Sequence, residues 1–336
     1  FRDPVAFGML PNPADGWQIY VTDASGGPSA PLTTLPGMDN NFLTSLGSAI
    51  NLDRTHVAFQ SSDDDDGFGE YDAFVMALNK SEFVNTRGSG PEFAPSWSPD
   101  GSRIVFAGYD WGGSSKIFVA SPDLASVDQV TPDGESWDNA PIFSPDGTRI
   151  AHQQDADIYV MDVDGSNRVN VSAGASRPEG SVDLISSWSD DGTRVLFKRW
   201  TESPGETVAL WIADADGSNA VYLTSEVSPF SGPAAFGPDG RVYYTRCSDG
   251  SECSTKDVWV MNADGSDATA LTTSGNEAFS GSFNPTRTFE GPAAPGQWLI
   301  SVQSPLSESG TIFRMGLDGS DKTELASGTL DSVRWN

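Results

Sequence analysis

The segment Ile158-Tyr159-Val160-Met161-Asp162-Val163-Asp164-Gly165 places an aromatic residue among apolar neighbours and ends in a short acidic turn. The same order returns at 210–217 (LWIADADG) and at 258–265 (VWVMNADG). β-Branched and aromatic residues followed by Asp and Gly are typical of a strand that leads into a tight turn. The chain therefore repeats one strand-and-turn unit.

Looser copies of this unit are centred on Tyr20, Phe74, Phe118 and Phe313, which gives seven aromatic positions spaced 41 to 54 residues apart. A second phrase lies upstream of the aromatic position, and its clearest form is Trp97-Ser98-Pro99-Asp100-Gly101. Pro and Asp-Gly favour a tight reversal between two strands. Strand-like units that recur with this period predict a β-propeller.

The residues that lead the upstream phrase recur at steps of 45 to 52 residues: Ile50, Trp97, Phe143, Trp188, Phe236, Phe283 and Trp335. The N-terminal segment begins directly with a second strand at 5–10, and its missing first strand is found at the C-terminus. We therefore expect one all-β domain over residues 1–336, a seven-bladed β-propeller of four-stranded antiparallel blades. In it, the C-terminal strand 331–336 pairs with the N-terminal strands in blade one, which protects exposed sheet edges.

The composition limits the partners. The chain has 336 residues, 47 acidic and 19 basic, and a formal net charge of −28. Nucleic acid is excluded as a partner because phosphate binding needs clustered Lys and Arg. No apolar run is long enough to insert into a membrane. Cations, basic proteins and neutral glycans remain, and the alternative is that the charge only keeps a monomer soluble.

Two cysteines, Cys247 and Cys253, lie six positions apart and are the only ones in the chain. A close pair of this kind suits a disulfide bridge in an oxidising compartment, which predicts a secreted or periplasmic protein. The alternative is two free thiols on a surface loop.

The combined phrases Ser-Pro-Asp-Gly-x-Arg (98–103 and 144–149) and Ile-Tyr-Val-Met-Asp-x-Asp-Gly-Ser-Asn (158–167) resemble the TolB-type propeller repeat, a bacterial relative of the WD repeat. The resemblance implies a propeller fold. It leaves function open, because the family includes periplasmic proteins that bind other proteins, N-terminal domains of peptidases, and oligogalacturonate lyases. TolB itself has six blades and an additional N-terminal domain, so we expect a protein that is not TolB proper. The lyases use a His-rich metal centre, whereas this chain has only His56 and His152.

In a propeller the inter-blade connections and the longer strand-connecting loops share one face, which is the expected ligand face. Three acids, Glu92, Asp138 and Asp183, fall at the same register in successive blades. They suit a site for cations or basic groups, since adjacent carboxylates repel unless compensated. The structural alternative is that each carboxylate accepts hydrogen bonds from neighbouring loops.

One loop is rich in hard oxygen ligands: Asp63, Asp64, Asp65, Asp66 and Glu70. Such ligands with Gly between them suit Ca²⁺, although the spacing does not match an EF-hand. The alternative is a solvated acidic loop. No motif for an organic cofactor is present, and none is expected.

Three tryptophans, Trp111, Trp137 and Trp200, do not follow the repeat and fall in loops of the expected ligand face. Exposed indoles beside carboxylates suit the binding of sugar rings, and the neighbouring Lys198 and Arg199 suit an acidic sugar or a carboxylate. Loop packing is the alternative.

Two hypotheses of function follow. The first is a secreted or periplasmic propeller that binds a protein or polysaccharide ligand through its loop-rich face and central funnel. The second is a polysaccharide lyase or another carbohydrate-active enzyme, in which His152 and Arg199 carry the proton transfer. His152 occupies the strand position that Phe106 and Phe197 occupy in other repeats, and packing is its alternative role.

Overall fold

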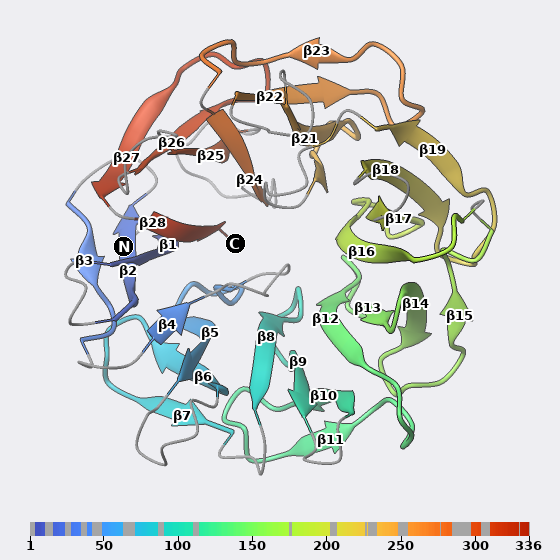
Figure 1. The fold of residues 1–336 in the computed structure, drawn as a ribbon. Helices are drawn as coiled ribbons and strands as arrows, with labels where there is room; N and C mark the ends of the chain where they lie inside the picture. The colour runs from blue at the N-terminus through green and yellow to red at the C-terminus, as the bar shows by residue number, and fades with distance from the viewer. Residues whose placement is uncertain are drawn as a thin grey trace.

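The computed structural model describes residues 4–10, 16–23, 28–34, 39–41, 49–62, 71–86, 91–109, 114–174, 177–201, 207–225, 227, 234–247, 255–275, 277–283, 297–303, 310–328 and 330–335. Within these ranges, seven four-stranded antiparallel sheets are arranged in a ring (Figure 1). Each sheet is called a blade here, numbered along the chain. Strands β28, β4, β8, β12, β16 and β24, each the first named in its blade below, lie towards the centre of the ring (Figure 1).

The first three blades have these strands. Blade one contains β28 (Leu330–Trp335), β1 (Pro4–Met9), β2 (Gln18–Asp23) and β3 (Ala30–Pro31). Blade two contains β4 (Asp39–Asn41), β5 (His56–Ser62), β6 (Tyr71–Ala77) and β7 (Phe83–Asn85). Blade three contains β8 (Glu92–Trp97), β9 (Ile104–Tyr109), β10 (Ser115–Ala120) and β11 (Val127–Gln129).

The other four blades continue the ring. Blade four contains β12 (Asp138–Phe143), β13 (Arg149–Gln154), β14 (Asp157–Asp162) and β15 (Val169–Asn170). Blade five contains β16 (Ser181–Trp188), β17 (Arg194–Thr201), β18 (Thr207–Asp214) and β19 (Val221–Thr224). Blade six contains β20 (Ala235–Phe236), β21 (Val242–Cys247), β22 (Lys256–Met261) and β23 (Thr269–Ala270). Blade seven contains β24 (Glu277–Phe283), β25 (Gln297–Gln303), β26 (Gly310–Gly316) and β27 (Thr323–Gly328).

Blade one contains strands from both ends of the chain. β28 pairs antiparallel with β1, with Val5 opposite Trp335 and Phe7 opposite Val333. Val5 and Phe7 are also buried against Ile312 and Leu325 of blade seven. The β28–β1 pairing therefore joins the two ends of the chain within blade one, and side-chain packing joins blade one to blade seven.

The predicted fold class must be corrected for the innermost strands of several blades, which differ from the prediction in position or length. Ile50, predicted to lead the innermost strand of blade two, makes only an isolated bridge to Val57. That strand is instead β4, where Asn40 is buried and its amide donates to the carbonyl oxygen of Trp17 in blade one. The polar sequence of β4 carries no strand signal, so pairing with β5 overrides local propensity. The closing strand is Leu330–Trp335, not 331–336, and β20 has only two residues.

The Ser-Pro-Asp-Gly turn is held by its own side chains. In blade three the Ser98 hydroxyl donates to Asp100 Oδ1 at 2.6 Å, and the Ser102 amide donates to the same oxygen at 3.0 Å. Gly101 has φ of 71°, a backbone conformation that favours glycine. The hydrogen bond from Ser98, followed by that from Ser102, lowers the pKa of Asp100 to about 2. The motif therefore encodes a locally complete turn.

The Arg that follows this turn joins neighbouring blades. Arg103 of blade three lies 5.7 Å above the Phe143 ring of blade four and donates to the carbonyl oxygen of Gly147. Arg149 repeats the arrangement one blade further on, 5.2 Å above the Trp188 ring. A cation above an aromatic face is attractive, so these arginines stabilise the ring of blades.

The Asp-x-Asp-Gly turn also contacts the preceding blade. Gly165 of blade four has φ of +85°, and a Cβ at this position would overlap the carbonyl oxygen of Val130 in blade three. A glycine is required there for two independent reasons, the backbone conformation and the close approach.

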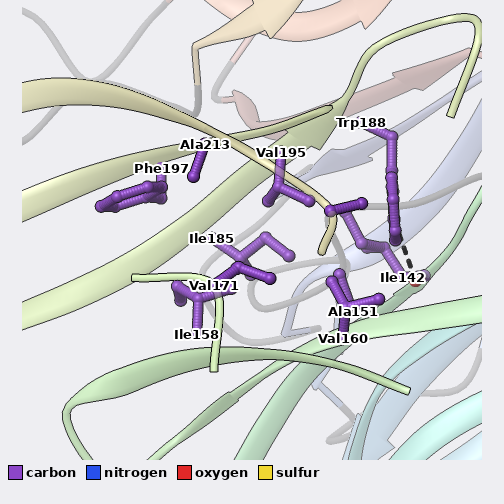
Figure 2. Close-up of a cluster of buried hydrophobic side chains, with 11 residues drawn as sticks. Ile142, Ala151, Ile158, Val160, Val171, Ile185, Trp188, Val195, Phe197 and Ala213 are labelled. Carbon is purple, nitrogen blue, oxygen red and sulfur yellow. Dashed lines mark hydrogen bonds between the residues drawn. The ribbon is translucent and has the colours of Figure 1, made fainter. Parts of the chain in front are cut away.

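The core between blades consists of aliphatic and aromatic side chains from facing sheets. Figure 2 shows the cluster between blades four and five, where Ile158 and Val171 lie close to Ile185 and Trp188 lies beside Ile142. The Trp188 indole donates to the carbonyl oxygen of Ile142 at 3.4 Å. Burial of such apolar surface provides most of the stabilisation of the ring.

Candidate functional site

One end of the sheets gathers the inter-blade connections. The innermost strand of each blade begins there, the second ends there and the third begins there, as the pairing of Asp138 with Gln154 and of Gln154 with Asp157 shows in blade four. We call this end the connection face. Four residues that the sequence predicted for a ligand site lie at or near the start of an innermost strand at this end: Glu92, Trp137, Asp138 and Asp183.

The predicted acids of this face are buried and have side-chain partners. Asp138 and Asp183 are fully buried, and Glu92 is 7% exposed. Glu92 accepts a hydrogen bond from the Thr86 hydroxyl at 2.8 Å. A carboxylate at such a depth is stable only when it is paired or hydrogen-bonded, so these groups hold the connections together in this structure.

Asp183 is paired with Arg199, a residue predicted for catalysis. Arg199 donates through Nε to Oδ1 and through a terminal nitrogen to Oδ2 of Asp183, both at 2.7 Å. The Arg199 guanidinium also lies 5.1 Å from the centre of the Trp211 ring and is 2% exposed. Two parallel hydrogen bonds are the strong form of an Arg–carboxylate pair. Here they direct the Arg199 guanidinium at Asp183.

Asp138 is the centre of a second buried cluster that joins blades three and four. Its carboxylate oxygens lie 3.8 Å from Lys116 Nζ, 3.4 Å from His152 Nδ1 and 3.5 Å from a terminal nitrogen of Arg168. Burial raises the pKa of Asp138, and the charges of Arg168 and Lys116 oppose that shift. Asp138 thus connects two cations and an imidazole below the surface.

His152 in this cluster is neutral at physiological pH. Burial, followed by repulsion from Arg168, lowers the pKa of His152 to about 3. Its Nδ1 faces two acceptors, the Asp138 carboxylate and the carbonyl oxygen of Gln153, so the proton is assigned to Nδ1. Nε2 is buried and has no hydrogen-bond partner among the described residues. The ring stacks on Tyr159, 6.0 Å between centroids, as the packing alternative predicts.

Trp137 is the predicted residue that the connection face presents to solvent. It is 47% exposed and lies directly before β12. Its ring meets Tyr109 of blade three edge to face, with centroids 4.8 Å apart, and Tyr109 in turn packs on Phe93 at 5.4 Å. Burial raises the pKa of the Tyr109 hydroxyl. An exposed indole is thus supported from below by two aromatic rings.

The backbone around Trp137 is fixed on several sides. Its amide donates to Asp155 Oδ1 at 3.0 Å, and its carbonyl oxygen accepts from the Asp155 amide at 2.8 Å. Lys116 Nζ donates to the carbonyl oxygen of Ser136 at 3.0 Å. The buried Asp138 cluster therefore positions the segment that carries the exposed indole.

The other predicted residues differ in placement. Lys198 is 6% exposed, and burial lowers its pKa to about 8. Trp200 is half-buried against the core between blades five and six. The remaining predicted residues lie outside the described ranges: Trp111, Asp63, Asp64, Asp65, Asp66, Glu70 and Cys253. The predictions of a Ca²⁺ site and of a Cys247–Cys253 bridge therefore stay predictions. Within the described ranges, no group of three or more His, Cys, Asp or Glu side chains is arranged to hold a metal ion.

Sequence reasoning missed Lys116, Arg168, Tyr109 and Asp155. The signal for Lys116 is its position in the repeat. It directly precedes a buried apolar residue of the third strand, where blades four and six have Asp157 and Asp257. Three of the six other blades have an acid at this position, namely Asp72, Asp157 and Asp257, and Lys116 is the one cation among the seven. Its amino group lies 3.8 Å from the buried Asp138 carboxylate.

Comparisons with known proteins agree with the fold. No protein-family model matches the chain. The Tol-Pal system protein TolB of Francisella tularensis subsp. mediasiatica is 33% identical over 79 residues, 22% of this chain and 18% of that protein. The matched stretch thus spans less than a fifth of that relative.

Two solved structures extend the likeness. TolB from Acinetobacter baumannii gives a TM-score of 0.51 at 17% identity, covering 79% of this chain and 62% of that one. An oligogalacturonate lyase in complex with manganese gives 0.53 at 15% identity, covering 69% and 64%. The chain therefore has a TolB-like β-propeller fold. At these identities the likeness is one of fold, and function must come from the site.

Proposed function

We propose that this chain is a TolB-like binding propeller that takes its ligand on the connection face, at the junction of blades three and four. The observation that supports the proposal most is Trp137, an indole about half open to solvent on a backbone held by Asp155. Large exposed aromatics on rigid backbone are favoured binding groups, because little conformational entropy is lost when a ligand binds.

The buried ion pairs support binding more than catalysis. Arg199 donates to Asp183 through two nitrogens, and Asp138 is surrounded by Lys116, Arg168 and His152. These groups serve as a rigid frame below the surface, which a preorganised binding site needs.

The enzyme hypothesis has no comparable support. A general acid or base must come within hydrogen-bond reach of the proton that it transfers. His152 is fully buried, and Arg199 is 2% exposed. Incubation with uronic-acid polysaccharides tests this hypothesis, because lyase action produces an unsaturated product that absorbs in the ultraviolet. We expect no such absorbance.

A secreted or periplasmic location is part of the proposal. It is supported by the two cysteines, which are close enough in sequence to form a bridge in an oxidising compartment. Within the described residues, no helix has the length and apolar character needed to cross a membrane. Purification without reductant, followed by thiol counting before and after reduction, tests the bridge on which this location rests.

The binding proposal is tested by fluorine NMR of protein labelled with 5-fluorotryptophan. The chain has ten tryptophans, and Trp137→Phe assigns the Trp137 resonance by removing it. A panel of short oligosaccharides and of basic, neutral and acidic peptides is then titrated. We expect one class to shift the Trp137 resonance saturably. The proposed site would be overturned if ligands of the panel shifted the resonances of other tryptophans and left the Trp137 resonance unchanged.

A further inference from the structure

The groups around Trp137 differ in what they offer to a ligand. The Asp155 carboxylate lies 3.0 Å from the Trp137 amide nitrogen, and Glu135, two residues before Trp137, is exposed. The nearby cations Lys116 and Arg168 are directed at the buried Asp138. A ligand that approaches Trp137 therefore meets an aromatic ring and carboxylates, on a chain with a net charge of −28.

The protein itself pairs its aromatic rings with cations. Arg149 lies above Trp188 at 5.2 Å, Arg168 above Tyr159 at 4.3 Å and Arg246 above Trp259 at 4.2 Å. Among the described residues, no such cation lies above the Trp137 ring, which is 47% exposed. The indole is the best of the aromatic faces for a cation, and neighbouring carboxylates strengthen the attraction.

We propose that the Trp137 site takes a positively charged side chain, a guanidinium or an ammonium group, from a basic segment of a partner protein. This inference rests on the proposed binding function and specifies its ligand class. A neutral glycan would donate hydroxyl hydrogen bonds to the carboxylates but would gain no charge attraction from them, and an anionic glycan would be repelled by them. The charge around the site therefore favours a basic protein segment over a polysaccharide.

The experiment compares two peptides that differ only in charge. Acetyl-arginyl-glycyl-arginine amide carries two guanidinium groups, and its citrulline counterpart has the same shape without them. Both are titrated against fluorotryptophan-labelled protein at low salt. We expect the arginine peptide to shift the Trp137 resonance and the citrulline peptide to bind about tenfold more weakly.

Three variants sharpen the test. Trp137→Leu keeps an apolar side chain and the net charge but removes the aromatic face together with the reporter resonance, so its binding is measured by isothermal titration calorimetry beside the wild type. We expect about tenfold weaker binding of the arginine peptide. Asp155→Asn keeps an oxygen acceptor for the Trp137 amide and removes the charge, which should weaken binding about threefold and reduce its salt dependence. Phe83→Ala, at an aromatic residue 61% exposed on β7, is the matched control and should bind as the wild type does.

The outcomes separate this inference from the proposed function. Equal binding of the arginine and citrulline peptides by the wild-type protein would overturn the charge-based inference without reliance on any variant. A neutral oligosaccharide such as cellotriose that shifts the Trp137 resonance, with no response to the arginine peptide, would also overturn it and leave the binding site intact. Binding of the arginine peptide with no change at Trp137 would overturn both.

Discussion

Arg199 and Asp183 form a bidentate ion pair between adjacent strands of blade five, with both nitrogen–oxygen distances at 2.7 Å and both side chains buried. Removal of the guanidinium leaves a buried carboxylate without its counter-charge. We expect Arg199→Met to lower the free energy of unfolding by about 3–5 kcal/mol in urea titrations. The control is Arg241→Met, because Arg241 and Asp239 are 38% and 27% exposed, and its effect should be about 1 kcal/mol. Equal effects of the two variants would show that the buried pair has no special role.

Gly165 tests the contact between the Asp-x-Asp-Gly turn and the preceding blade. A Cβ at Gly165 meets the carbonyl oxygen of Val130, whereas Gly240, with φ of +74°, has no atom within 4 Å of the same position. Gly240→Ala should therefore cost only the backbone strain, about 1 kcal/mol. Gly165→Ala should cost clearly more, measured as a lower melting temperature. Similar melting temperatures for the two variants would refute the close contact.

His152 makes stability depend on pH in a defined direction. The pKa of His152 is lowered from 6.5 to about 3 in the folded protein, so the unfolded chain binds the additional proton between these values. The contribution of neutral His152 to the free energy of unfolding is therefore fully present above about pH 6.5. It is lost as the pH falls toward 3, by about 1.4 kcal/mol per pH unit. His152→Phe introduces the residue found at this position in blades three and five and should flatten that slope.

The measurement for His152 is the free energy of unfolding at several pH values, for the wild-type protein and for His152→Phe. Asp138, whose pKa is raised, contributes in the opposite direction, but it is present in both proteins. The difference between the two curves therefore reports His152 together with its coupling to Asp138, which lies 3.4 Å away. Two parallel curves would contradict a buried neutral imidazole.

Lys116 connects the buried cluster to the exposed indole. Lys116→Met removes the hydrogen bond to the Ser136 carbonyl oxygen and one of the cations that face Asp138. We expect amide hydrogen exchange at Trp137 to become about tenfold faster, because local opening costs less free energy. Lys80→Met, at an exposed lysine of blade two, should leave that exchange unchanged. No acceleration in Lys116→Met would show that the cluster does not position Trp137.

Much of the fold could be predicted because its signals are local. The hydrogen bonds of the Ser98–Arg103 turn join residues at most five positions apart, so a short stretch of sequence is enough to predict the turn. The strand Asp39–Asn41 was not predictable, since its polar residues pair through β5 and through contacts with blade one. Local sequence carries no record of such tertiary pairing.

The site was predictable only in part for the same reason. The position of Trp137 outside the repeat indicated a residue free of core packing, and its exposure agrees with that interpretation. The partners of Asp138, namely Lys116 and Arg168, lie 22 and 30 positions away along the chain, and the partner of Asp183 lies 16 positions away. Only the register between neighbouring strands and blades brings these charges together.

The central claim is that ligands bind at Trp137. The most direct test is the dissociation constant of the ligand that responds best in the fluorine NMR panel, measured for the wild-type protein, Trp137→Leu and Phe83→Ala. We expect the constant to rise about tenfold in Trp137→Leu and to stay unchanged in Phe83→Ala. A folded Trp137→Leu protein that binds this ligand as tightly as the wild type would contradict the account.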